Sequence, residues 1–99
     1  VRNLFEMGIK KVLIADKVSG ECADFLQKND IHVDFVPDIC RADLIKVIPN
    51  YECLVVRSRI TVDDEIIKAG KKLKMICRAG TGIDNIDKKA CEDRGICVT

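Results

Sequence analysis

Several features that often indicate a function are scarce in these 99 residues. Tryptophan is absent, and the chain has one tyrosine and one histidine, His32. A nucleophilic triad requires a histidine in a catalytic loop, whereas His32 falls inside a strand-like run, so no such triad is predicted. No apolar run approaches the roughly 18 residues of a membrane span, and the opening "VRNLFEMGIKK" shows no secretory signal. We therefore expect a cytoplasmic chain without a membrane partner.

The chain also lacks an excess of charge of either sign. Its formal net charge is +1, with 33% charged and 47% hydrophobic residues. This balance is typical of a globular domain and argues against nucleic-acid binding that depends on charge alone. Any anion-binding site must therefore be formed locally.

Cysteine is plentiful, but the spacing typical of metal or redox motifs is missing. The six cysteines include no CxxC pair, and several lie in apolar runs such as "ECLVV", "MIC" and "GICV". Reduced cysteine behaves as a small hydrophobic residue, so we interpret these as structural thiols and predict no metal site. A zinc site and redox or disulfide roles are the alternatives.

Short apolar runs of β type alternate regularly with helical patterns, and this alternation predicts the fold. The expected strands are residues 11–16, 31–36, 53–58, 73–80 and 96–99. Residues 31–36 alternate as an edge strand should, whereas the consecutive apolar residues 53–56 indicate a central strand that is buried on both faces.

Four helices are expected between these strands. Ser19 would cap the first, which runs to residue 29, and Pro37 and Asp38 would open the second, which Pro49 ends. Thr61 would cap the third, which Gly70 closes. The fourth would start at residue 87 and be capped by residue 95.

The predicted fold class is α/β, a flavodoxin-like three-layer α/β/α arrangement with a parallel five-stranded sheet in the order 2-1-3-4-5. Residues 1–10 are expected to be a leader or a short helix, and residues 11–99 a single domain. Because the chain stops at Thr99 as a fifth strand begins, we expect a piece of a larger protein.

In such a sheet, the residues that bind ligands are expected just beyond the carboxyl ends of the strands. Arg57 and Arg78 follow or end strands that should be neighbours, and the arginine fork suits carboxylate and phosphate oxygens. The sequence therefore predicts that the two side chains hold one anion. The alternative is a solvated or salt-bridged arginine, with Asp16 or Asp84 as its partner.

The loop "RAGTGID" follows the fourth strand. Glycines permit sharp turns, and successive backbone N–H groups in such a turn favour an anion. "GTGIDN" is not a GxGxxG dinucleotide motif, because Asn85 takes the place of the third glycine. A phosphoacceptor receiver domain is also disfavoured, since Arg57 stands where it needs an acidic residue.

Residues 55–99, with "VRS", "RAGTGIDNID" and "RGI" in order, resemble the substrate-binding domain of the D-isomer-specific 2-hydroxyacid dehydrogenases, and the resemblance extends back to "KVLIAD". It implies a flavodoxin-like first domain of an NAD-dependent oxidoreductase that acts on 3-phosphoglycerate or 3-phosphooxypyruvate. It further implies a role in serine biosynthesis and a homo-oligomeric full-length enzyme.

The resemblance also implies roles for particular residues. Arg57 and Arg78 would bind the substrate, with Ser58 in the same "VRS" motif and Arg59 as a possible helper. The Gly80, Thr81 and Gly82 backbone would face the substrate carboxylate, Thr81 would also approach NAD, and Asp84 and Asn85 would shape the turn.

The catalytic arginine, glutamate and histidine of the family, and its nucleotide-binding domain, are expected outside these residues, so the chain alone should be inactive. Another dehydrogenase of the class, such as a glyoxylate or hydroxypyruvate reductase, remains an alternative. So does a stand-alone flavodoxin-like binding or regulatory module without catalysis.

Overall fold

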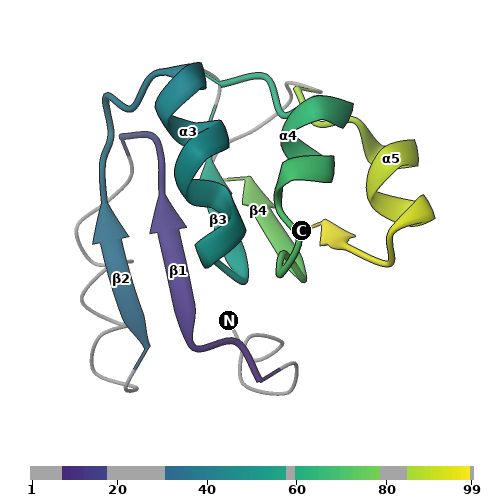
Figure 1. The fold of residues 1–99 in the computed structure, drawn as a ribbon, viewed down its shortest axis with the longest axis horizontal. Helices are drawn as coiled ribbons and strands as arrows, with labels where there is room; N and C mark the ends of the chain where they lie inside the picture. The colour runs from purple at the N-terminus through teal and green to yellow at the C-terminus, as the bar shows by residue number, and fades with distance from the viewer. Residues whose placement is uncertain (1–7, 18–30, 58–59, 79–84, 99) are drawn as a thin grey trace.

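The computed structural model describes residues 8–17, 31–57, 60–78 and 85–98, and the helix expected at residues 19–29 lies outside them. The described residues form one five-stranded sheet in the order β2-β1-β3-β4-β5, and every pair of neighbouring strands is parallel (Figure 1). The strands are β1 Lys11–Ile14, β2 His32–Phe35, β3 Cys53–Val56, β4 Met75–Arg78 and β5 Cys97–Val98. The predicted strands and their order are confirmed.

Strand β3 lies at the centre of the sheet, between β1 and β4. All four of its residues are buried, as the consecutive apolar letters predicted. Strand β2 is an edge strand, and His32 is an exposed residue within it, 3.0 Å from the carboxylate of Asp34. The sheet thus places the ends of β1, β3 and β4 beside one another.

The helices that the structure describes cover one face of the sheet (Figure 1). They are α3 Arg41–Val47, followed by the 3₁₀ turn η1 Ile48–Asn50, then α4 Asp64–Ala69 and α5 Lys88–Asp93. Leu44, Ile66 and Cys91 pack from these helices against Leu54 and Ile76 of the sheet. Among the described residues, no helix is long and apolar enough to cross a membrane.

A second apolar cluster lies on the opposite face of the sheet. Val12 and Ile14 of β1, Cys53 and Val55 of β3 and Met75 of β4 belong to it. Both faces of the central strands are therefore buried, which explains why their sequences are apolar at consecutive positions.

The predicted start of the second helix was wrong. Helix α3 begins at Arg41 rather than at Pro37, because the chain first makes a turn in which the Ile39 N–H donates to the Val36 carbonyl at 3.2 Å. The predicted end is confirmed, because α3 ends at Val47 with Ile48 as its C-cap, directly before Pro49. Pro49 itself lies in the first turn of η1, where its missing N–H costs nothing.

The predicted N-cap of the third helix was also wrong. Asp63, not Thr61, caps α4, and its carboxylate accepts a hydrogen bond from the Ile66 N–H at 3.3 Å. Two further boundaries are confirmed: Gly70 closes α4, and Asp87 caps α5 by accepting from the Ala90 N–H at 3.1 Å.

The described cysteines are thiols rather than disulfides. Cys53 and Cys91 are buried and Cys77 is half-buried, but Cys40 and Cys97 are exposed. The interpretation of "GICV" as a buried run was therefore wrong for Cys97, because this residue lies on the short edge strand β5.

Candidate functional site

The candidate site lies at the carboxyl edge of the sheet, where β1, β3 and β4 end. The strand order reverses between β1 and β3, since β2 lies on one side of β1 and β3, β4 and β5 follow on the other. In open parallel sheets this switch point is where ligands bind, because the loops on its two sides diverge and leave a crevice.

Asp16 connects the ends of β1 and β3. Its side chain is buried, with the residue only 5% exposed, and it accepts hydrogen bonds from two backbone N–H groups. Oδ1 accepts from the Lys17 N–H at 2.8 Å, and Oδ2 accepts from the Arg57 N–H at 3.1 Å. A buried carboxylate requires such partners, so Asp16 holds the backbone of Arg57 at the end of β3.

Arg57 is exposed directly after β3, and its guanidinium leans toward β1. Its Nη1 donates to the carbonyl of Lys17 at 3.4 Å. The alternative prediction paired an arginine side chain with Asp16. Asp16 does contact Arg57, but it accepts from the backbone N–H of Arg57 and not from its guanidinium.

Arg78 ends β4 on the other side of β3. It is half-buried, and the strand register places it opposite Val56, so Arg57 lies one residue farther along the edge. The structure confirms that the two arginines come from neighbouring strand ends. The Arg57 guanidinium points toward β1, away from β4. Binding of one anion by both guanidinium groups therefore stays a prediction.

Asn85 ties the loop after β3 to the loop after β4. Its side-chain amide donates to the carbonyl of Arg57 at 2.7 Å and to the carbonyl of Ile60 at 2.6 Å. The residue is 7% exposed, and among the described residues no donor reaches its buried Oδ1. Asn85 thus contacts the loop after β3, and its expected role in shaping its own turn stays a prediction.

A short backbone bridge reinforces this link. The Val62 N–H donates to the Asn85 carbonyl at 2.8 Å, and the Asp87 N–H donates to the Val62 carbonyl at 2.9 Å. The backbone that carries Arg57 and the loop that follows Arg78 are thus joined by both side-chain and main-chain hydrogen bonds.

Sequence reasoning missed the bonds of Asp16 and Asn85 to the backbone at Arg57. The available signal for Asp16 was an acidic residue directly after a buried strand at the expected switch point. The remaining predicted site residues, Ser58, Arg59, Gly80, Thr81, Gly82 and Asp84, lie outside the described residues, and their roles stay predictions.

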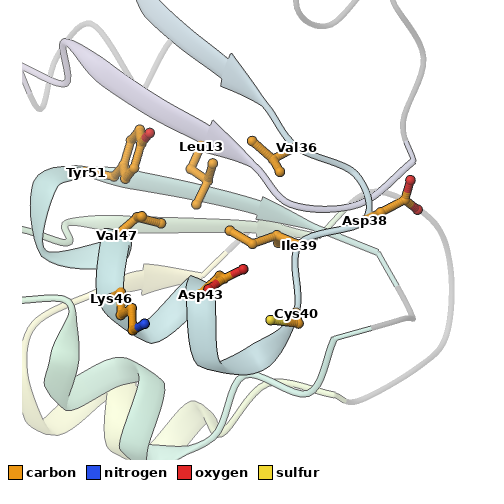
Figure 2. Close-up of a pocket in the computed structure, with 9 residues that line it drawn as sticks. All are labelled: Leu13, Val36, Asp38, Ile39, Cys40, Asp43, Lys46, Val47 and Tyr51. Atoms are coloured by element: carbon orange, nitrogen blue, oxygen red, sulfur yellow. The ribbon is translucent and has the colours of Figure 1, made fainter.

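A separate groove lies between α3 and the sheet. It measures about 510 Å³, and Figure 2 shows Leu13, Ile39, Val47 and Tyr51 beside it, with Asp43 on α3. The described residues that line it include none of the predicted site residues. The groove is therefore distinct from the edge that carries the arginines.

Comparison with known proteins adds a family and several relatives. The family described as D-isomer specific 2-hydroxyacid dehydrogenase, catalytic domain, matches residues 12–99. A D-3-phosphoglycerate dehydrogenase of Archaeoglobus fulgidus is 48% identical over 88 residues, which are 89% of this chain and 17% of that protein. One of Sus scrofa is 38% identical over 90 residues, 91% of this chain and 17% of that protein.

Solved structures agree with these relatives. An NAD⁺-bound 3-phosphoglycerate dehydrogenase of Entamoeba histolytica has a TM-score of 0.79 at 33% identity, covering 91% of this chain and 32% of that one. A protein of Pyrococcus horikoshii has a TM-score of 0.84 at 28% identity, covering 91% of this chain and 27% of that one. The chain thus spans 17% of the length of the curated relatives and about a third or less of these structures.

Proposed function

Because the chain belongs to the family of D-isomer specific 2-hydroxyacid dehydrogenases, we propose that it is the substrate-binding domain of an NAD-dependent D-3-phosphoglycerate dehydrogenase. The domain would comprise residues 11–99, preceded by a leader or short helix at residues 1–10. The enzyme would interconvert 3-phosphoglycerate and 3-phosphooxypyruvate.

The observation that carries this proposal is the placement of Arg57 and Arg78 at neighbouring strand ends beside the switch point of the sheet. The substrate bears a carboxylate and a phosphate, and guanidinium groups bind the oxygens of both in pairs. The relatives named D-3-phosphoglycerate dehydrogenase, at up to 48% identity, support the choice of substrate.

The role of this chain would be to bind and orient the substrate. NAD, when bound, would supply the acceptor for the hydride that leaves C2 of the substrate, and the catalytic arginine, glutamate and histidine would come from another part of the protein. Arg57, Ser58 and Arg78 would bind the anionic groups, and the backbone at Gly80–Gly82 would face the carboxylate. Domain closure would then exclude water from the cleft.

NAD would be held mainly by residues outside this chain, since "GTGIDN" lacks the third glycine of the dinucleotide motif. We assign only Thr81 to contact with the cofactor. We further propose a cytoplasmic, homo-oligomeric enzyme of serine biosynthesis with small-molecule substrates and neither nucleic-acid nor membrane partners.

The test is a substrate comparison on the purified protein that contains this chain. With NAD present, 3-phosphoglycerate should generate NADH absorbance, whereas D-glycerate, which lacks the phosphate, should react far more slowly. Faster oxidation of NADH with glyoxylate than with 3-phosphooxypyruvate would replace the proposal by a glyoxylate reductase. No hydride transfer with any of these acids would favour a binding module without catalysis.

A further inference from the structure

Two cysteines meet on the face of the sheet opposite the described helices. Cys53 of β3 and Cys77 of β4 have their Sγ atoms 4.0 Å apart. Both belong to the apolar cluster on this face, where Cys53 is fully buried and Cys77 is half-buried. The two thiols are therefore in direct contact, and Cys77 is the more accessible of them.

The contact also affects the ionisation of the Cys77 thiol. A hydrogen bond from Cys53 lowers the pKa of the Cys77 thiol, against the opposing effect of burial. A thiolate rather than a thiol is the nucleophile, so Cys77 is the one prepared to react. Cys53, held beside it, is placed to attack whatever forms on the Cys77 sulfur.

We propose that Cys53 and Cys77 form a redox-active dithiol that a hydroperoxide, such as hydrogen peroxide, converts reversibly into an intramolecular disulfide. The proposal does not depend on the proposed function, although Cys77 directly precedes Arg78 in β4. A partly accessible cysteine in contact with a second thiol is the arrangement expected of a peroxide-sensitive pair.

The reaction balances in two steps. The Cys77 thiolate attacks one oxygen of the peroxide, the O–O bond breaks, and the departing hydroxide takes a proton to become water, leaving a sulfenic acid. The Cys53 thiol then attacks the sulfenic sulfur, a second water leaves, and the S–S bond forms. Two thiols lose two electrons, and one peroxide is reduced to two waters.

The strand register indicates that this disulfide would be easily reduced. Met75, not Cys77, lies opposite Cys53, so the two cysteines occupy diagonal positions, which are farther apart than direct partners. Closing the bond must pull β3 and β4 toward a different alignment and store strain. Strained disulfides have higher reduction potentials and are the labile ones.

Peptide mapping tests the proposal directly. The purified protein is treated with hydrogen peroxide, its remaining thiols are alkylated, and it is digested with trypsin without reductant. Cleavage after lysine and arginine places Cys53 alone in residues 47–57 and Cys77 alone in residues 75–78. We expect these two peptides to be joined and to have lost two hydrogen atoms, and dithiothreitol to separate them.

Variants distinguish this pair from general oxidation. Cys53→Ala should abolish the joined peptide and leave Cys77 as a sulfenic acid that dimedone traps, and Cys77→Ala should leave Cys53 unreacted. Cys91→Ala, which removes a buried thiol elsewhere, should still yield the joined peptide. Circular dichroism verifies that each variant is folded. Unmodified thiols at Cys53 and Cys77 in folded wild-type protein, or a disulfide to another cysteine instead, would overturn the proposal.

Discussion

The side-chain amide of Asn85 donates a hydrogen bond to the main-chain carbonyl of Arg57 across 2.7 Å. The two residues are 28 positions apart in sequence and lie in loops that follow different strands. The same amide also holds the carbonyl of Ile60, so both ends of the segment that begins at Arg57 depend on one buried side chain. The position of a predicted substrate arginine is thus set partly by a residue outside its own loop.

Replacing Asn85 with aspartate should destabilise the fold. The carboxylate of Asn85→Asp has no N–H to donate, and it would face the carbonyls of Arg57 and Ile60 in a buried site. We expect the free energy of unfolding, measured by urea denaturation, to fall by about 2–3 kcal/mol. The same change at exposed Asn50 is the control and should cost less than about 0.5 kcal/mol. Equal effects at the two positions would refute the role of Asn85.

Removing the guanidinium of Arg57 should weaken substrate binding. Losing a charged hydrogen bond costs about 1.5–3 kcal/mol, so Arg57→Ala should raise the KM for 3-phosphoglycerate roughly tenfold to hundredfold in the protein that contains this chain. Arg41→Ala is the control, because Arg41 is an exposed arginine on α3 paired with Asp63 at 2.8 Å and Glu65 at 3.1 Å. Unchanged KM and kcat in Arg57→Ala would contradict the assignment of this arginine.

The strand order could be predicted because the local pattern of apolar residues distinguishes central strands from edge strands. Consecutive apolar residues at 53–56 indicate burial on both faces, and the strand they form is the central one. Once the order was expected, residues directly after the strands could be placed at one edge, which brought Arg57 and Arg78 to neighbouring strand ends.

Two finer details could not be predicted, one because two nearby residues were equally suitable and one because it joins distant residues. Whether Asp63 or Thr61 caps α4 is decided by which side chain reaches the Ile66 N–H, and both residue types are good caps. The bond from the Arg57 N–H to Asp16 joins residues 41 positions apart, and no local pattern indicates it.

The hydrogen bond from the Tyr51 hydroxyl to Asp34 should contribute to stability in a defined pH range. This bond lowers the pKa of the Asp34 carboxyl, while burial first and then Asp34 raise the pKa of Tyr51 to about 12. A lowered carboxyl pKa stabilises the fold above the ordinary value of 3.8, and this contribution is lost as the pH falls through the folded value. The raised pKa of the Tyr51 hydroxyl stabilises the fold below pH 10, and this contribution is lost as the pH rises toward about 12.

Tyr51→Phe should therefore lower the free energy of unfolding by about 1 kcal/mol near neutral pH, at the low end for a charged bond because the Asp34 side chain is 37% exposed. The difference from wild type should shrink below the ordinary carboxyl pKa. Urea denaturation at several pH values measures this difference, and a double-mutant cycle with Asp34→Ala, which removes the acceptor, isolates the pair. Additive effects of the two substitutions would show that the bond contributes nothing.

The 99-residue chain by itself should bind NADH negligibly. Tight binding of a dinucleotide requires glycines that let the backbone approach the pyrophosphate at the start of a helix, and Asn85 occupies the place of the third one. The Asn85 side chain donates to the carbonyls of Arg57 and Ile60. This residue therefore joins two loops and does not leave the space that a pyrophosphate would need. Calorimetric titration of the chain, after circular dichroism has verified an α/β fold, measures the affinity. Micromolar or tighter binding of NADH would place the cofactor site in this domain and overturn its assignment to substrate binding.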